Sequence, residues 1–511
     1  MTTSGTGVLV APHAQGERPR EGTVTAPEDP MVASQSPSES PAPPQRLSRY
    51  LLGVGLVVML AGLLFGYDQG VISGALSGID KTFHPGTLVI EVITSWVTLG
   101  AMAGALAAGT LTEHYGRRMS ILIAAVVFVV GALLEALAPN TFVLVIGRLV
   151  LGAGVGVASV AAPLYGAENA PAHVRGRFVS LYQMAITVGI FLAYFADYLL
   201  ISGNGWRIML GISAIPAVLL LVAIWPLGDS ARWYLKVGRR DEAVAVLHKV
   251  DPSTDAEAEA SRLEQSIETD APASWREVFA RQWRKPLSVA ALLAILQQLT
   301  GINAIIYYAD TIFAAAGFNN PTSQSLATLW AVGAVNVVAT LVAVLWVDRF
   351  GRKPLLLLGS AGMCIGLLVV AGAFFELQKV TSSERATHAP ASAGILALIG
   401  LVIFIASFAF SLGPVVWTVI NEVFPSRVRG RGVAVATAIN WFAAWVVAQT
   451  FLSLVNTITT EGTFLLFAGF CVITFVYVRF FLPETKGKTL EEVQEMWADP
   501  KELHRAIHTW R

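Results

Sequence analysis

The feature that most constrains this chain is a series of long apolar segments. A bilayer core about 30 Å thick needs roughly 20 apolar residues per helix, and twelve segments of that kind follow one another along the sequence. They lie near residues 50–78, 88–111, 119–138, 141–165, 177–200, 206–227, 286–316, 325–347, 354–376, 393–420, 431–456 and 463–482. We therefore predict an all-α membrane protein with twelve transmembrane helices.

Composition supports this class and excludes others. Of 511 residues, 54% are hydrophobic and 14% charged, against about 25% charged in soluble domains. Lys plus Arg and Asp plus Glu both total 35, so no basic field exists that would hold nucleic acid. Both cysteines stand in apolar segments, which argues against a disulfide framework or a thiolate metal site. We expect a lipid bilayer as partner and no metal or cofactor.

One short string, Gly487-Lys488-Thr489, resembles part of a phosphate-binding loop. Leu482 stands where that pattern needs its first glycine. The sequence thus argues against an ATP-driven pump, and nothing in it implies catalysis.

Polar intervals divide the chain into five parts. Residues 1–46 are rich in Pro, Ser, Thr and Gly and are predicted to be a disordered tail. We see no cleavable signal peptide and expect the first span to remain as an anchor. A six-helix bundle over 47–227 precedes a helical linker at 228–285, and a second bundle over 286–482 precedes a C-terminal tail at 483–511.

The distribution of Lys and Arg predicts the orientation. Thirty of the 35, counting those at the ends of spans such as Arg479, lie on the N-terminal side of the membrane, and three, Lys81, Lys379 and Arg385, lie on the other side. Since cytoplasmic loops carry the excess of Lys and Arg, we expect both termini, the linker and both tails in the cytoplasm.

The two halves repeat a pair of signatures. Residues 113–118 (EHYGRR) follow the second span and residues 348–353 (DRFGRK) follow the eighth. Glu168 and Glu422 each precede an arginine by seven residues, after the fourth and tenth spans. Topology alone would explain the positive charge but not the acid, the glycine and the spacing. We infer two pseudo-symmetric six-helix bundles, an arrangement with which many transporters alternate access.

Together, these and further motifs resemble the sugar porter family of the major facilitator superfamily over about residues 50–490. The motifs are Gly66-Tyr67-Asp68, Ile72-Ser73-Gly74, the two Gly-Arg loops, Gly147-Arg148, Gln297-Gln298-Leu299-Thr300-Gly301-Ile302-Asn303, Gly413-Pro414 with Trp417, and Pro483-Glu484-Thr485-Lys486-Gly487. The segment Leu227–Arg232 departs from the family's usual Pro-Glu-Ser-Pro-Arg. The resemblance implies a sugar transporter of the major facilitator fold, similar to bacterial proton-coupled xylose, galactose and arabinose symporters.

Asp68 is the most informative single residue. An ionised Asp inside a span costs about 2.5 to 3.5 kcal/mol on insertion scales, so it is expected to face a partner or a cavity. Arg148 in the fourth span lies at a similar depth and is the predicted partner. Proton-coupled relatives carry Asp here, so the pair is a candidate proton-coupling site, with a static ion pair as the alternative. Those symporters often carry a further acid where this chain has Ser213.

Glycines recur every four residues around Asp68, which predicts a face for close packing against another helix. They are Gly62, Gly66, Gly70, Gly74 and Gly78.

A sugar site needs neutral amides for hydroxyls and an aromatic face for C–H surface. The spans contain several amides, for each of which a helix-to-helix hydrogen bond is the alternative. The resemblance implies that the residues contacting sugar are Gln183, Gln297, Gln298, Asn303, Asn336 and Trp417, with Asn440 and Trp441 as looser candidates.

Helix bends are predicted at Gly301, beside Tyr307 and Tyr308, and at Gly413-Pro414. They could act as gates or be static kinks. Asp310 is interpreted as a solvated acid at a helix end, with a second proton site as the alternative.

The cytoplasmic signatures also predict a latch. Glu168 and Glu422 are expected to form ion pairs between the two halves that hold the inner side closed in the outward-open state, although the basic residues could serve only as membrane anchors. The candidate arginines are Arg117, Arg118 and Arg352.

We therefore expect a monomeric, multi-pass protein of the plasma or inner membrane that carries a hexose or pentose by alternating access, with protons as co-substrate. A facilitative sugar or polyol uniporter is the alternative, and a non-transporting sugar sensor is a remote one.

Overall fold

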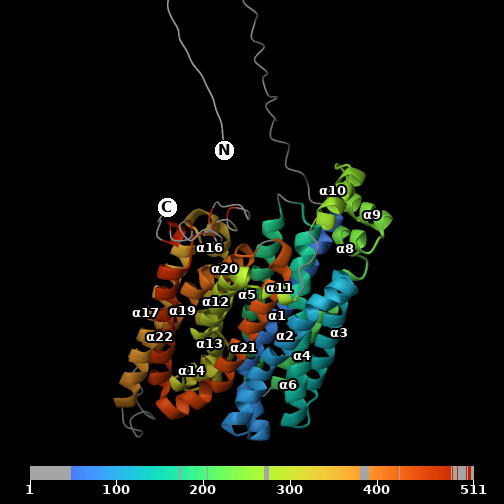
Figure 1. The fold of residues 1–511 in the computed structure, drawn as a ribbon. Helices are drawn as coiled ribbons and strands as arrows, with labels where there is room; N and C mark the ends of the chain where they lie inside the picture. Colours follow the sequence, from blue (N-terminus) through green and yellow to red (C-terminus); the bar gives the residue numbers. More distant parts are fainter. Residues whose placement is uncertain are drawn as a thin grey trace, which may run out of the picture. The chain divides into compact units, whose positions relative to one another are not determined.

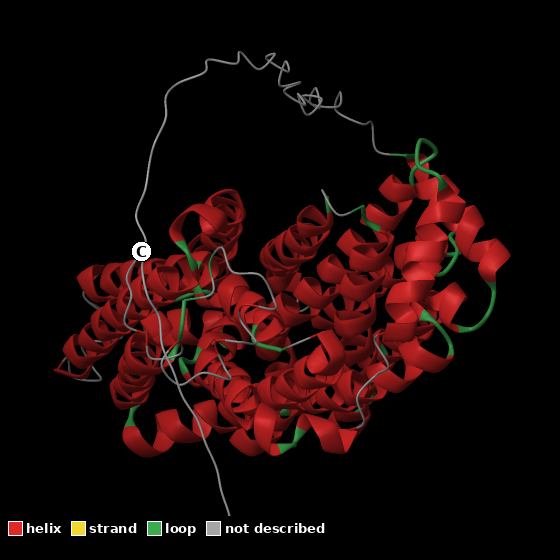
Figure 2. Ribbon diagram, turned by 45° about the horizontal axis from the view of Figure 1, so that its top comes forward, coloured by secondary structure: helices red, strands yellow, loops and turns green. Residues whose placement is uncertain are grey.

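The structure is a computed structural model that describes residues 48–171, 174–203, 205–269, 275–379, 391–424, 426–484 and a few positions beyond. These residues form helices and short connections without a strand (Figure 2). The tail predicted for residues 1–46 and most of the tail predicted for 483–511 lie outside the described residues.

Twelve segments among the described residues are long and apolar enough to cross a membrane, as predicted (Figure 1). Eight of them are formed by single continuous helices, or nearly so. These are α1 (Arg49–Phe83), α2 (Thr87–His114), α3 (Arg117–Ala136), α4 (Thr141–Asn169), α5 (Arg175–Leu200), α17 (Arg352–Lys379), α21 (Ser426–Ile458) and α22 (Thr460–Phe481).

The other four spans are interrupted. The sixth consists of α6 (Trp206–Ile212) and α7 (Ala214–Ile224), and the seventh of α12 (Arg284–Leu299), α13 (Ile302–Tyr307) and α14 (Ala309–Ala315). The eighth consists of α15 (Pro321–Ala327), the π-helical η3 (Thr328–Ala334) and α16 (Val335–Phe350), and the tenth of α19 (Ala391–Phe410) and α20 (Leu412–Glu422). Gly301 has φ 89°, a conformation that glycine adopts without strain. The bends predicted at Gly301 and at Gly413-Pro414 are thus present.

The polar interval between the halves folds into short helices. They are α8 (Ala231–Lys236), α9 (Arg240–Val250), α10 (Ala256–Thr269) and α11 (Trp275–Val278). α8, α9 and α10 lie together (Figure 1) and share a small apolar core with Ala243 and Val246, against which Tyr50 of α1 packs. The two six-helix halves and the helical linker are therefore as predicted.

Close packing joins α1 to α5. A Cβ atom added to Gly66 would stand 1.9 Å from the carbonyl oxygen of Ile186, and one added to Gly62 would stand 2.6 Å from that of Tyr182. Since real Cβ atoms do not approach so closely, both glycines are needed for this contact. The glycine face predicted from the four-residue spacing is a packing face.

Hydrogen bonds between the halves gather at one end of the bundle. We call the end with the turns at Gly116 and Gly351 the inner end and the opposite one the outer end. In the described part of the chain, hydrogen bonds that cross between the halves include those of Ser95 with Gln449, Tyr194 with the Ile306 carbonyl, Ser73 with the Asp310 amide, and Glu91 with Ser453. Each joins segments from the outer half of their spans.

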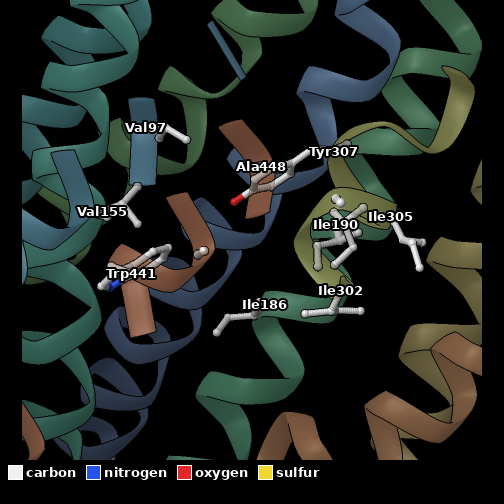
Figure 3. Close-up of a cluster of buried hydrophobic side chains, with 14 of the residues drawn as sticks. Val97, Val155, Ile186, Ile190, Ile302, Ile305, Tyr307, Trp441 and Ala448 are labelled. Atoms are coloured by element: carbon white, nitrogen blue, oxygen red, sulfur yellow. The ribbon is translucent and has the colours of Figure 1, made fainter. Parts of the chain in front are cut away.

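A buried apolar cluster, drawn in Figure 3, contains side chains of both halves. Its labelled members are Val97, Val155, Ile186 and Ile190 from the first half and Ile302, Ile305, Tyr307, Trp441 and Ala448 from the second. Phe65 of α1 meets Trp441 edge to face, with ring centroids 5.4 Å apart. Apolar packing therefore accompanies the polar contacts between the halves.

Candidate transport site

The centre of the first half holds a buried ion pair. Arg148 Nη1 of α4 donates to Asp68 Oδ1 of α1 at 2.6 Å, and both side chains are almost fully buried. Arg148 Nε also donates to the carbonyl oxygen of Ile93 at 3.1 Å. The glycines on either side of Asp68 face α5, so the carboxylate points to α4 instead. The matching depths of Asp68 and Arg148 correctly predicted their proximity.

A second acid lies on the same arginine. Glu135 Oε2 of α3 is 3.7 Å from Arg148 Nη1, and the Glu135 side chain is 1% exposed. Gly147 makes room for it, because a Cβ atom there would stand 2.8 Å from Glu135 Cγ. Sequence reasoning missed Glu135. In the sequence, Glu135 is an acid near the end of an otherwise apolar span. Acids at such positions usually lie in water, so the sequence alone did not mark it as a buried residue.

Four amides of the second half form one hydrogen-bonded cluster. Gln297 and Gln298 come from the end of α12, Asn303 from α13 and Asn440 from α21. Asn440 Nδ2 donates to Gln297 Oε1 at 2.8 Å and its Oδ1 accepts from Gln298 Nε2 at 3.2 Å. Asn303 Nδ2 donates to Gln298 Oε1 at 2.9 Å.

The cluster also reaches the break in the tenth span. Gln297 Nε2 donates to the carbonyl oxygen of Leu412 at 2.8 Å, next to Gly413. An amide carries both donors and acceptors, so these side chains can replace their hydrogen bonds to one another with hydrogen bonds to sugar hydroxyls. We call Gln297, Gln298, Asn303 and Asn440 the amide cluster.

The other predicted sugar contacts are not joined to it. Asn336 at the start of α16 is buried, whereas Gln183 on α5 and Trp417 on α20 are half-buried. Among the described residues, no hydrogen bond connects these three side chains to the amide cluster.

Tyr307 and Tyr308, which follow the predicted bend at Gly301, are both buried. Tyr308 Oη donates to the carbonyl oxygen of Ala448 at 3.1 Å, and its ring stacks on Phe451 with centroids 5.0 Å apart. Tyr307 is 1% exposed and lies in the cluster of Figure 3.

The interpretation of Asp310 as a solvated acid is wrong. Its carboxylate is buried and accepts hydrogen bonds from the hydroxyls of Ser325 and Thr328. The break at Tyr308 starts a new helix, α14, that carries Asp310 against α15 and η3. Hydroxyl groups there take the place of water.

In this structure the inner-end residues form ion pairs within each half, and their pairing across the halves, which is expected in the outward-open state, stays a prediction. Arg117 Nη2 lies 2.7 Å from Glu168 Oε1 within the first half, and Arg352 Nη2 lies 3.0 Å from Glu422 Oε1 within the second. Each turn lies beside the end of a helix of its own half, and the glutamate at that helix end is the acid that the arginine reaches. Arg118 instead donates to the carbonyl oxygen of Trp225 at 2.8 Å.

The segment that departs from the family's usual sequence has a structural role. Asp229 accepts hydrogen bonds from the first two backbone N–H groups of α3, both at 3.0 Å. Glu484 does the same for α17 in the second half, at 3.1 and 2.9 Å. Burial raises the pKa of Asp229, while bonds from the N–H groups of Ser230 and α3 oppose that rise. Asp229 and Glu484 are equivalent caps of the two halves.

Comparisons with known proteins agree with this architecture. The family model described as "Sugar (and other) transporter" matches residues 54–497. The galactose-proton symporter of Escherichia coli K12 is 39% identical over 444 residues, covering 86% of this chain and 93% of the relative. The arabinose-proton symporter of the same strain is 38% identical over 443 residues, covering 86% and 92%.

Solved structures are similar as well. The inward-open form of the xylose transporter XylE from E. coli has a TM-score of 0.74 at 31% identity, covering 88% of this chain and 100% of the other. The proton:xylose symporter XylE bound to 6-bromo-6-deoxy-D-glucose has a TM-score of 0.72 at 32% identity, covering 88% and 99%.

The fold and the buried polar groups define a membrane transporter of the major facilitator superfamily. Within that class, the chain belongs to the sugar transporter family. It is a multi-pass membrane protein and not an enzyme.

Proposed function

We propose that this protein imports a monosaccharide together with protons by alternating access. The observation that carries the proposal is the buried contact of 2.6 Å between Asp68 and Arg148. A carboxylate at this depth is costly unless it is paired or protonated, so it can bind and release a proton as the pairing changes. The galactose, arabinose and xylose symporters among its relatives support the same function.

In the proposed cycle, Asp68 must be protonated before the loaded carrier closes. Arg148 competes for the carboxylate in the empty carrier and so favours release of the proton. Because the ion pair and the protonated acid exclude each other, proton binding and the conformation of the carrier are linked.

The amide cluster is the proposed sugar site. Its side chains come from both sides of the break at Gly301, and Gln297 donates to the Leu412 carbonyl beside the break at Ser411, so a change at either break would alter their geometry. Gln183, Asn336 and Trp417 are proposed to approach the sugar when it binds.

We further propose that the inner end faces the cytoplasm, with both termini on that side, as the Lys and Arg distribution indicates. The hydrogen bonds at the outer end then make this an inward-facing state. The domain boundaries at 46, 227, 285 and 482, a monomeric functional unit and a plasma or inner membrane location are parts of the same proposal.

Uptake of labelled sugars by transport-deficient cells tests the function. A panel of hexoses, pentoses and inositol would be measured with and without a protonophore. Symport predicts that accumulation of the substrate collapses with the protonophore and that adding sugar to vesicles causes proton uptake. Uptake that never exceeds the external sugar concentration and is insensitive to the protonophore would identify a facilitative uniporter instead.

A further inference from the structure

We propose that Glu135 is a second partner of Arg148 that shares one proton with Asp68, so that the three residues act as one unit in proton coupling. The inference rests on the proposed symport and assigns a role to a residue outside the pair described above.

Charge balance within the site is the first argument. Arg148 supplies one positive charge, and Asp68 and Glu135 supply two carboxyl groups, at 2.6 and 3.7 Å from the same Nη1 atom. All three side chains are almost fully buried. An uncompensated charge in such a place is very costly, so the three groups are most stable with one proton on one of the acids.

The surrounding helices supply no other compensating charge. On α6, Arg207 donates to the carbonyl oxygen of Ala138 and lies over the Trp206 ring. On α2, Glu91 bonds to Ser453 of the other half. α7 has no charged residue, and the Tyr307 phenol of α13 lies near Arg148 and Asp68. Among the described residues, the ion pairs of Glu135 and of Asp68 are therefore both with Arg148.

The hydrogen bonds show that the arrangement has room to change. Glu135 Oε1 and Arg148 Nη2 are buried and have no hydrogen-bond partner in this state. A small movement of the guanidinium towards Glu135 would let Arg148 Nη2 donate a hydrogen bond to Glu135 Oε1. The arginine can thus leave Asp68 without becoming unpaired.

Two arrangements follow from these contacts. In one, Asp68 is ionised and paired with Arg148 while Glu135 carries the proton. In the other, Asp68 has bound a proton from the outer side, and Glu135, having released its own proton, is ionised and paired with Arg148. On return, the proton passes from Asp68 to Glu135. The cycle between the two arrangements therefore takes up one proton at Asp68 and releases one from Glu135. Both are neutral overall, so Glu135 makes the protonation of Asp68 easier by taking over the arginine. Glu135 is a positioning residue for the coupling site, because it acts through Arg148.

Glu135→Gln separates this role from a structural one. Gln is similar in shape but cannot ionise, so protonating Asp68 would leave Arg148 without a carboxylate. We expect the pH for half-maximal uptake in vesicles to fall by about one unit or more, since a neighbouring charge moves a titration by about 1 to 3 units. Glu376→Gln, an exposed acid paired with Lys379, is the control and should leave the profile unchanged.

Sugar exchange by Glu135→Gln at acid pH confirms that the variant is folded. If Glu135→Gln exchanges sugar and its pH profile is the same as that of the parent, the proposal is overturned. That result would mean that Glu135 stays protonated throughout the parent's cycle and therefore acts no differently from Gln.

Infrared spectroscopy gives a second reading that needs no change at position 135. At neutral pH, Asp68→Asn should lose one band of a buried protonated carboxyl relative to the parent, because Glu135 ionises to pair with Arg148. Retention of that band would contradict the shared proton. This spectroscopic result does not depend on symport. If the proposed symport is wrong, the parent protein will instead take up no protons when sugar is added.

Discussion

At the scale of single residues, the proposed function rests on the polar groups inside the spans. Asp68 and Arg148 could be matched from the sequence because each charge is isolated in an apolar segment and their depths agree. Glu135 and Asp310 could not be placed in the same way. Both stand near the ends of spans, and only the packing of neighbouring helices decides whether such an acid meets water or protein.

The sugar site gives a residue-scale prediction. Gln298→Ala removes one amide of the amide cluster, and a sugar hydroxyl left without its partner costs on the order of 1 to 3 kcal/mol. We expect the affinity for sugar to fall about five-fold or more, measured by binding to the purified protein. Gln324→Ala, on an outer-end helix away from the cluster, is the control. Unchanged affinity in Gln298→Ala would remove that residue from the site.

At the scale of elements, the spacing of residues in the sequence predicts which face of a helix packs closely but not which helix packs against it. The four-residue glycine repeat correctly indicated a packing face on α1, whereas the identity of α5 as its neighbour depends on the whole bundle. The breaks at Gly301 and near Gly413 were predictable from backbone chemistry. The pairing of Arg117 with Glu168 inside one half was not, because the same residues could equally reach the other half in another state.

Two glycine variants test the packing of α1 on α5. Gly66→Ala places a methyl group against the Ile186 carbonyl and should destabilise the protein by about 1 to 3 kcal/mol, as overpacking does. Gly109→Ala on α2 meets nothing within 4 Å and should leave stability unchanged or slightly improved. Thermal unfolding in detergent compares them. Equal midpoints would show that the α1 contact is not tight.

The cap of α3 can be tested by a graded pair. Asp229→Ala removes the acceptor for two backbone N–H groups and should cost about 0.5 to 2 kcal/mol, as is usual for helix caps. Asp229→Asn keeps an acceptor and should lose less. If both variants unfold at the temperature of the parent, Asp229 is not a cap of energetic importance.

At the scale of the whole molecule, the twelve spans and the two halves were predictable because apolar length and repeated signatures are written directly in the sequence. The conformational state was not, because one sequence must encode both the inward-facing and the outward-facing arrangement. The contacts between Glu91 and Ser453 and between Ser95 and Gln449 belong to one of these states.

A variant at the outer end tests the assignment of that state. Glu91→Ala removes two hydrogen bonds to Ser453, and bonds to charged groups are worth about 1.5 to 3 kcal/mol. The outward-open population should rise about tenfold or more. Labelling of cysteines introduced at the outer end, in a background without Cys364 and Cys471, reports it. Labelling equal to that of a Glu376→Ala control would contradict the role of this contact.

The most direct test of coupling is transport by Asp68→Asn under an imposed pH gradient. Asn imitates the protonated acid but cannot release a proton, so the empty carrier cannot reset through the ionised form. Sugar binding and sugar-for-sugar exchange in vesicles should survive, because neither needs that step, while uphill accumulation should disappear. Sustained accumulation driven by the pH gradient in Asp68→Asn would contradict Asp68 as the coupling site.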